Sequence, residues 1–148
     1  NFISQYQNIA DEFTSSGVEV ELSKRFNSQW NVTANYTFTQ ADKRFALRIP
    51  EHKVNASVQF QPGVNTNFSL SYQYNTDRED RFFNSDTFEQ ESVTLDAFGL
   101  LDFYVSQQVS KNLQLFAHLS NLLDEEYEEL YRYSTRGRNL RLGFSLKF

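Results

Sequence analysis

The sequence contains no cysteine and no methionine, only two prolines and five glycines, and no long apolar run. Without cysteine, the chain can form neither disulfide bonds nor thiolate metal sites. A membrane-spanning helix needs a run of about 18 apolar residues, so the lack of such a run excludes one. With no initiator methionine and no signal peptide at Asn1, we expect the chain to be a processed product or a fragment.

What the sequence does have is a regular alternation of apolar with polar or small residues. The alternation is clearest in the segment 139–148, and it returns in the segments 30–40, 53–61 and 67–75. Side chains of a β-strand point to opposite faces in turn, so each segment predicts a strand with one apolar and one polar face. The polar faces are too polar for a dry core. The pattern therefore predicts a wall with lipid outside and a hydrated or plugged lumen inside.

The composition agrees with a lipid-facing wall. The mean hydropathy is -0.60 and the formal net charge is -5, values that on their own suggest a soluble protein. Outer-membrane β-barrels have similar averages because only every second strand residue meets lipid. Aromatic residues make up 16% of the chain, with 15 Phe and 8 Tyr, which is typical of girdles at the two membrane interfaces. We therefore predict an all-β fold, an antiparallel transmembrane β-barrel.

We predict seven strands and a stub, joined by connections that alternate between short and long. The predicted strands are 9–26, 30–40, 53–61, 67–75, 101–109, 113–119 and 139–148, with the stub at 1–7. The short connections are the turns at 27–29, 62–66 and 110–112, and the long ones are the loops at 41–52, 76–94 and 122–138. Outer-membrane barrels have short periplasmic turns and longer outer loops, so we expect the C-terminus and the short turns to be periplasmic.

Aromatic residues sort by depth in this arrangement. Those expected at the turn end are Trp30, Phe60 and Phe148, and those expected nearer the loop end are Tyr36, Phe38, Tyr72 and Tyr74. Two such levels are what the two interfaces of a bilayer favour.

The loop 76–94 is a candidate for ligand contact. It mixes charged and aromatic side chains, which suits a ligand with apolar and polar parts, and loops on a rigid scaffold often carry binding. The candidate contact residues in the outer loops are Arg78, Arg81, Phe82, Phe83, Phe88, Tyr131 and Tyr133. The alternative for Phe82 and Phe83 is packing against neighbouring loops.

Nothing in the sequence assembles a catalytic or metal site, and we predict neither enzyme activity nor a bound metal or cofactor. The acidic run 124–129 offers oxygen ligands of the kind that calcium takes, but charge runs in exposed loops are more often solvated. The two histidines, His52 and His118, lie on different predicted strands and have no nucleophile paired with them. Arg136 and Arg138 form a small basic patch, which in an acidic chain predicts no nucleic-acid contact.

Four groups of residues follow the order and spacing of a known set of motifs. They are Asn121, Leu122, Leu123, Asp124 and Tyr127 with Tyr131, Thr135, Gly137 and Arg138; Asn8, Gly17, Val18 and Glu19; Arg48, Pro50, His52 and Lys53; and Leu101, Asp102 and Phe103. Together they resemble the C-terminal barrel region of TonB-dependent outer-membrane receptors, over essentially the whole chain. Within that family the sequence is similar to the vitamin B12 and siderophore receptors. One departure is Ala10, which lies nearer to Asn8 than the family's pattern has it.

The resemblance implies a barrel of about 22 strands with an N-terminal plug domain inside it and a short segment that contacts TonB. Residues 1–148 would supply the last seven or eight strands of that barrel, without the plug and without the TonB-contacting segment. Such receptors take up a metal chelate or a cobalamin-type ligand across the outer membrane of Gram-negative-type bacteria. The share of this chain would be barrel wall and outer loops, in contact with outer-membrane lipid.

The last predicted strand also resembles the family's recognition signal for the outer-membrane insertion machinery. The pattern polar-x-Gly-x-x-apolar-x-aromatic is carried by Arg141, Gly143, Leu146 and Phe148. A free strand end explains how such a segment could add to the edge of another sheet. The alternative is a final strand whose alternation produces this pattern by chance.

Two other arrangements stay open at this point. An open sheet leaves two unpaired edges, and unsatisfied backbone groups in hydrocarbon cost several kcal/mol each, so the sheet must close or pair with another segment. Closure would give a self-contained barrel of about eight strands with a structural or adhesive role. Pairing would also fit one half of a split or proteolysed receptor. A mostly neutral lumen-facing set favours the larger barrel, because small barrels usually contain charge networks. That set is Asn31, Thr33, Asn35, Asn55, Ser57, Gln59, Ser69, Ser71, Gln73, Asp102, Tyr104 and Ser106.

Overall fold

The computed structural model describes residues 12–42 and 46–148. Seven strands form one antiparallel sheet in the order β1-β2-β3-β4-β7-β8-β11. Their bounds are Ser15–Arg25 (β1), Trp30–Ala41 (β2), His52–Gly63 (β3), Thr66–Asn75 (β4), Phe98–Gln108 (β7), Leu113–Ser120 (β8) and Asn139–Leu146 (β11). Two hairpins lie outside the sheet: Arg78–Asn84 (β5) pairs with Glu89–Leu95 (β6), and Glu128–Leu130 (β9) pairs with Tyr133–Ser134 (β10).

The predicted sheet strands are confirmed where the structure describes them. The first begins at Ser15 within the described residues, while the predicted stub 1–7 and residues 9–11 lie outside them. Two predictions are wrong: the loops 76–94 and 122–138 are not irregular throughout, because each contains a hairpin. In the described part of the chain, no helix is long and apolar enough to cross a membrane.

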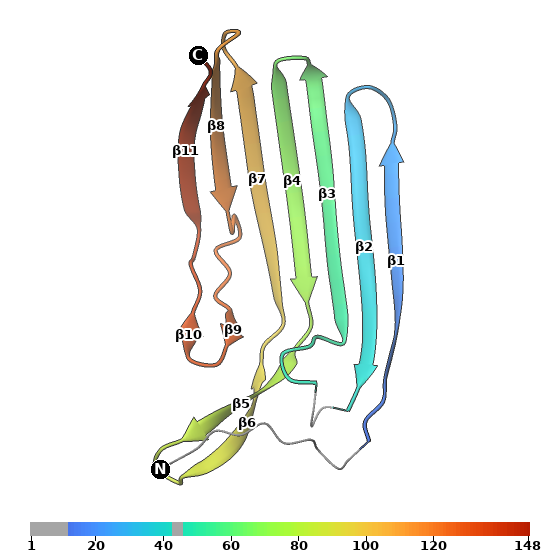
Figure 1. Ribbon diagram of the computed structural model, residues 1–148, viewed down its shortest axis with the longest axis vertical. Helices are drawn as coiled ribbons and strands as arrows, with labels where there is room; N and C mark the ends of the chain where they lie inside the picture. Colours follow the sequence, from blue (N-terminus) through green and yellow to red (C-terminus); the bar gives the residue numbers. More distant parts are fainter. Residues whose placement is uncertain (1–11, 43–45) are drawn as a thin grey trace.

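The short and long connections gather at opposite ends of the sheet. The tight turns between β1 and β2, β3 and β4, and β7 and β8 lie at the same end as the C-terminus (Figure 1). The hairpins β5–β6 and β9–β10 lie toward the other end, which we call the loop end. This is the asymmetry that the alternating connection lengths predict.

The register places the two kinds of side chain on opposite faces. Thr33 is paired with Ser57, Ser57 with Ser71 and Ser71 with Asp102, so the polar row crosses four strands. All of the predicted lumen-facing residues share this polar face by their register. Hydrogen bonds run along it, including one of 2.7 Å between the Thr33 and Ser57 hydroxyls.

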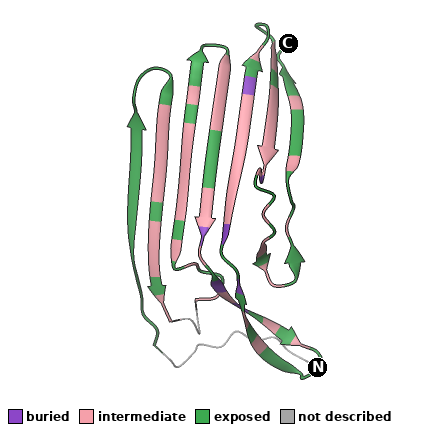
Figure 2. Cartoon of the chain, turned by 180° about the vertical axis from the view of Figure 1, so that it is seen from behind, coloured by how far each residue is buried: buried purple, intermediate pink, exposed green. Residues whose placement is uncertain are grey.

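The opposite, apolar face has nothing packed on it. Leu142 and Phe144 on β11 are each 69% exposed, and Val20 on β1 is 55% exposed. Among the residues that the structure describes, Leu95 and Phe98 are the only buried apolar side chains, and both lie near the loop end (Figure 2). Because burial of apolar area is the main favourable term in folding, a single sheet without a core needs an apolar surrounding to be stable.

Aromatic rings form a row across the apolar face nearer the turn end. Trp30 and Phe60 stack with centroids 4.2 Å apart, and Phe60 continues to Phe68 and Phe103 at 6.1 and 6.3 Å steps. A second level lies nearer the loop end, where Tyr36 and Phe38 pack on either side of His52. The predicted sorting of aromatic residues by depth is therefore present in the structure.

The sheet is open. Strand β1 pairs only with β2 and strand β11 only with β8 among the described residues. Each outer edge therefore presents unpaired backbone donors and acceptors, which in hydrocarbon must find a partner. The structure shows a segment of wall.

Candidate functional site at the loop end

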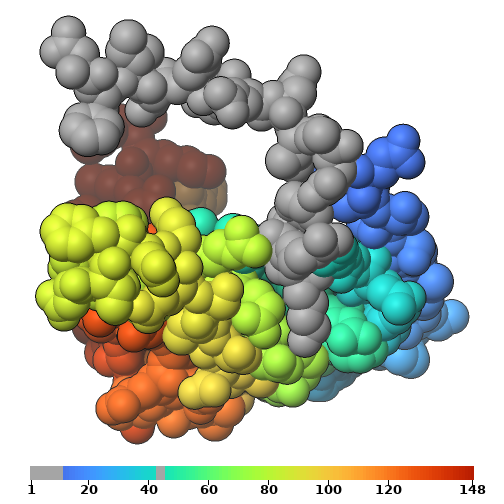
Figure 3. Space-filling view, turned by 90° about the horizontal axis from the view of Figure 1, so that it is seen from below, coloured from blue at the N-terminus to red at the C-terminus, as the bar shows by residue number. Residues whose placement is uncertain are grey.

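The buried carboxylate of Asp80 joins three separate segments at the loop end. Asp80 is 0% exposed, and its Oδ1 accepts the backbone N–H of Arg81 at 2.8 Å and lies 3.0 Å from the Arg48 Nε. Its Oδ2 accepts the backbone N–H of Tyr131 at 3.0 Å. A buried charge must be paired and hydrogen-bonded, and Asp80 satisfies that need with groups from both neighbouring loops. Hairpin β5–β6 is thereby fixed beside the segment that carries β9 and β10 (Figure 3).

Arg78 supports the same junction from the other side of the chain. Its Nη2 donates to the Glu128 carbonyl at 2.7 Å, and its guanidinium lies 4.8 Å from the centre of the Phe98 ring. The Phe98 ring in turn packs on Tyr127 with centroids 4.4 Å apart. Burial lowers the pKa of Arg78, and the nearby carboxylate of Glu129 acts in the opposite direction. Arg78 is only 6% exposed, so it positions the hairpin more readily than it meets a ligand.

The other candidate contact residues form two aromatic groups on the hairpin. Phe82 packs on Tyr131 at 4.5 Å, and the Arg132 guanidinium lies 5.1 Å from each of these two rings. Phe83 and Phe88 form an edge-to-face pair at 6.3 Å, with Phe88 at a φ of 58°. Of the predicted residues, those most open to solvent are Phe83, Phe88 and Tyr133, at 56%, 78% and 67% exposure. The structure thus brings Phe82 and Tyr131 together, and keeps Phe83 and Phe88 as a separate pair.

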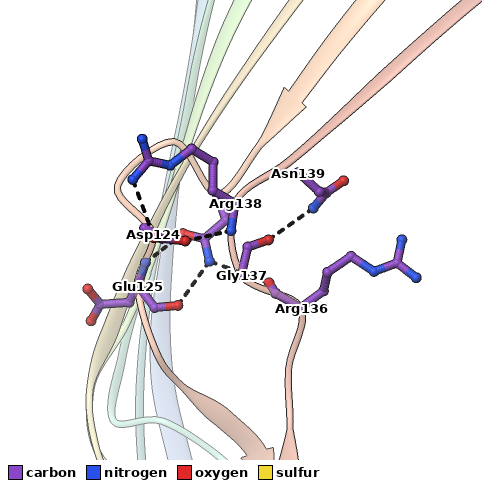
Figure 4. Close-up of polar contacts among 7 residues, drawn as sticks. Asp124, Glu125, Arg136, Gly137, Arg138 and Asn139 are labelled. Atoms are coloured by element: carbon purple, nitrogen blue, oxygen red, sulfur yellow. Dashed lines mark hydrogen bonds and ion pairs between the residues drawn. The ribbon is translucent and has the colours of Figure 1, made fainter.

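The motif that begins at Asn121 holds the strand β8 to the start of β11. Asn121 is 4% exposed; its Oδ1 accepts the Glu125 N–H at 2.9 Å, and its own N–H donates to the Asp102 carboxylate at 2.9 Å. The Asp124 Oδ1 accepts the Arg138 N–H at 2.8 Å, and its Oδ2 lies 3.4 Å from the Arg138 Nη2 (Figure 4). Asn121 and Asp124 have φ values of 52° and 57°, which short polar residues tolerate better than others.

Two pKa values change at this junction. The hydrogen bond from the Arg138 N–H, together with the Arg138 charge, lowers the pKa of Asp124. Burial raises the pKa of Tyr127, and the negative charge of Glu129 adds to the effect. Both oxygens of Asp124 face Arg138, so the acidic run offers its first carboxylate to an arginine. Within residues 12–42 and 46–148, no group of three or more metal-ligating side chains gathers in one place.

A serine, a histidine and an aspartate meet on the polar face, but in the wrong order for catalysis. The His118 Nε2 lies 3.6 Å from the Asp102 Oδ2 and 3.4 Å from the Ser120 Oγ. A catalytic relay needs the carboxylate and the hydroxyl on different ring nitrogens, so that the ring can pass a proton between them. Here both contact the same nitrogen, and the three residues form a polar cluster of the wall.

The residues predicted to form an assembly signal are spread along and beyond β11. Arg141 lies opposite His118 on the polar face, whereas Leu146 lies on the apolar face and Phe148 follows the strand. Gly143 has a local packing role, because a Cβ placed there would collide with the ring of Phe116 across the strand pair. Nothing in this geometry tests recognition by the insertion machinery.

Sequence patterns did not reveal the junction at Asp80. Arg48, Asp80 and the Tyr131 backbone lie far apart in the sequence, and none of them interrupts an alternating strand. One signal was available: Asp80 stands between Arg78 and Arg81 in a segment without alternation, which favours a charge network over a membrane strand. The partner residues could not be deduced from that signal.

Comparison with known proteins places this wall in a family. The sequence matches the family described as TonB dependent receptor-like, beta-barrel, over residues 1–122. It is 32% identical over 149 residues to the vitamin B12 transporter BtuB of Vibrio cholerae serotype O1, covering 97% of this chain and 23% of that protein. The chain therefore belongs to the TonB-dependent receptor β-barrel family, and the resemblance seen in the motifs is confirmed.

Solved structures show the same fold. The ferripyoverdine receptor of the Pseudomonas aeruginosa outer membrane matches with a TM-score of 0.73 and 17% identity, over 90% of this chain and 19% of that one. The ferric-catecholate import receptor Fiu of E. coli matches with a TM-score of 0.73 and 19% identity, over 90% of this chain and 21% of that one. The all-β, antiparallel fold class is confirmed, and the chain covers only the barrel part of these proteins.

The chain spans about a quarter of the length of the curated relative, 23%. Its family consists of outer-membrane β-barrel receptors and transporters rather than enzymes. This agrees with the geometry at His118, where no proton relay is assembled.

Proposed function

We propose that this chain forms barrel wall and outer loops of a TonB-dependent receptor that takes up a metal chelate or a cobalamin-type ligand. The observation that carries the proposal is the open sheet, which has one bare apolar face, one hydrogen-bonded polar face and two unpaired edges. Such a sheet is stable as part of a larger closed barrel in a membrane. The relatives' names supply the ligand classes, a vitamin B12 transporter and siderophore receptors.

The proposal includes the orientation and the partners. The C-terminus and short turns face the periplasm, and the hairpin β5–β6 faces outward. The remainder of the barrel pairs with β1 and β11, a plug domain lies against the polar face, and TonB contacts a segment outside these 148 residues. Ligand contact falls to the exposed aromatic residues of the hairpin, and Arg141, Gly143, Leu146 and Phe148 are recognised during assembly. The support for these roles is the asymmetry of connections and the family.

The test begins with the protein as it occurs in the outer membrane. It is purified in mild detergent, and the intact mass of every polypeptide that copurifies is measured. We expect a product of several hundred residues, or a tightly bound second polypeptide. A lone folded barrel of 17.4 kDa would contradict the receptor and support the self-contained small barrel.

Uptake is then measured in cells that express the complete receptor. The probes are labelled cyanocobalamin and the ferric complexes of one catecholate, one hydroxamate and one carboxylate chelator. We expect one probe to enter the cells, and we expect its entry to stop when TonB is absent while surface binding remains. Entry that does not depend on TonB, or no binding of any probe, would contradict the proposed function.

A further inference from the structure

A cleft of about 250 Å³ opens where the polar face of the sheet meets the outer loops. Its wall side is formed by the neighbouring ends of β3, β4 and β7, where Lys53 is paired with Asn75 and Asn75 with Phe98. Its outer side is formed by Arg48, Arg78 and Glu129, each from a different loop or hairpin. A molecule that enters the barrel from outside therefore meets this cleft where the loops end and the wall begins.

The cleft is lined by hydrogen-bond donors that the protein leaves available. The Lys53 side chain is exposed and forms no ion pair with any residue that the structure describes. Asn75 is only 7% exposed, and its side-chain amide makes no hydrogen bond within the described ranges. No side-chain polar atom that is sealed from solvent there lacks a partner, so the Asn75 amide must open into the cleft.

Arg48 is held in place for a further contact. Its backbone N–H donates to the Glu79 carbonyl at 2.7 Å, and its Nε pairs with the buried Asp80 at 3.0 Å. The φ of Arg48 is 62°, a sparsely populated conformation for this residue that the surrounding contacts maintain. Its side chain nevertheless stays 49% exposed. A guanidinium that is fixed through one nitrogen and open at its end is prepared to bind an oxyanion.

The local charge also favours an anion. The cleft is lined by three cations and one carboxylate, and the carboxylate of Asp80 lies behind Arg48, which leaves one net positive charge. Around it the hairpin segment 77–96 is strongly acidic, with seven acidic and two basic side chains. The cleft is therefore a positive site within a negative surface, and it suits a single negative charge.

We propose that this cleft binds an anionic oxygen group of the transported ligand, a carboxylate or a phosphate. The inference rests on the proposed function, because it takes the occupant to be the ligand that the receptor takes up. A carboxylate from the rest of the receptor is the competing occupant. The ligand is favoured because half of the lining comes from outer loops, which an arriving molecule meets first.

Lysine labelling of the complete receptor in detergent tests the proposal without knowledge of the ligand. The receptor reacts with trinitrobenzenesulfonate, and mass spectrometry follows the rates at Lys53 and at Lys111, which lies in a turn at the other end of the sheet. Inorganic phosphate and acetate are added in separate arms, so that the two oxyanions are distinguished. We expect one of them to slow the reaction of Lys53 at least about fivefold and to leave Lys111 unchanged, as a charge-assisted contact would.

Substitution of Arg48 separates the site from a general salt effect. We expect Arg48→Gln to abolish the protection of Lys53, and we expect Arg141→Gln, which changes another arginine of the polar face, to preserve it. Equal reaction of Lys53 and Lys111 with no anion effect would overturn the proposal. A Lys53 that is shielded from the start and insensitive to both anions would also overturn it, in favour of a carboxylate of the receptor itself.

The same variants distinguish this inference from the proposed function. If no uptake probe binds, the proposed function fails, while anion protection of Lys53 still decides whether the cleft is an anion site. If a probe does bind, we expect Lys53→Gln to weaken its affinity about tenfold and Lys111→Gln to leave it unchanged. Unchanged affinity in Lys53→Gln would show that the transported ligand does not use the cleft.

Discussion

The loop end and the sheet satisfy their side chains in opposite ways. At the loop end, Asp80, Arg78 and Asn121 are buried, and each is hydrogen-bonded by groups of this same chain. In the sheet, the apolar side chains of β1 and β11 remain more than half exposed at several positions, and both edges lack a partner among the described residues. The loop end is complete within the chain, whereas the sheet depends on lipid and on further barrel.

The largest effect is expected where the loop end depends on one buried charge. Asp80→Asn replaces one oxygen by a donor, so at least one of the contacts with Arg48, Arg81 and Tyr131 is lost whichever way the amide is oriented. We expect the junction to be destabilised by about 3 to 5 kcal/mol, the usual cost of breaking a buried ion pair. Hydrogen exchange at the Arg81 and Tyr131 amides measures it in the complete receptor.

The control for that prediction is Asp77→Asn, which changes an exposed carboxylate one residue before the hairpin. Its exchange rates should match those of the unmodified protein. If Asp80→Asn also left both amides protected, the three segments would be held together by contacts other than Asp80, and the loop end would not depend on it.

The second effect tests the dependence of the sheet on lipid. Val58 lies on the apolar face in the middle of β3, and its neighbour Ser57 lies on the polar face. We expect Val58→Arg to lower the free energy of unfolding in lipid vesicles by about 2 to 4 kcal/mol, because a charge at the bilayer midplane is poorly solvated. Denaturant titration measures the change, and Ser57→Arg is the control, for which we expect a much smaller loss. Equal losses at the two positions would contradict the assignment of the faces.

The third effect asks whether Gly143 serves assembly or packing. A Cβ at this position collides with the Phe116 ring, so Gly143→Ala should cost about 1 to 3 kcal/mol, as overpacking usually does. Phe116→Ala in the same protein should restore folding if packing alone is the reason. The folded fraction in the outer membrane, read from heat-modifiable migration, measures both variants.

Gly63→Ala is the matched control, because nothing lies within 4 Å of a Cβ placed there. If the double variant assembled as poorly as Gly143→Ala alone, Gly143 would be required by the insertion machinery and not by Phe116. That result would support the role in assembly that the C-terminal pattern predicts.

The same contrast explains how much of the molecule could be predicted from its sequence. In the sheet one face meets lipid and the other a polar interior, so strands such as β2 and β3 alternate visibly and were predicted within a few residues. Outside the membrane neither face meets lipid, and the hairpin β5–β6 has no such alternation. Its strands are joined by polar cross-strand contacts, including Asn84 to Glu91 and Thr94 to Glu79, which leave no periodic apolar pattern.

The start of β7 was missed for a related reason. Phe98 and Leu100 share the polar face, so the strand appears to lose its alternation before Leu101. The structure shows why Phe98 is apolar there: it is buried beneath Arg78 and against Tyr127. Contacts with residues distant in the sequence decide this position, and they also decide the partners of Asp80. Local patterns carry no information about either.

The smallest effect is expected at Asp124, where the loop end is most open to solvent. The pKa of this carboxyl is lowered from its usual value of 3.8 by the Arg138 N–H and the Arg138 charge. A group with a lowered pKa in the folded state stabilises it above the usual pKa, and the contribution is lost as the pH falls through the lowered value. We therefore expect hydrogen exchange at the Arg138 amide, corrected for its intrinsic pH dependence, to be constant from pH 7 to about 4 and to increase below that. Asp124→Asn keeps an acceptor and tolerates the positive φ, so it should remove the pH dependence and leave the fold intact. An identical acid response in Asp124→Asn would assign the change to other carboxylates and would show that even this junction does not rely on a single exposed pair.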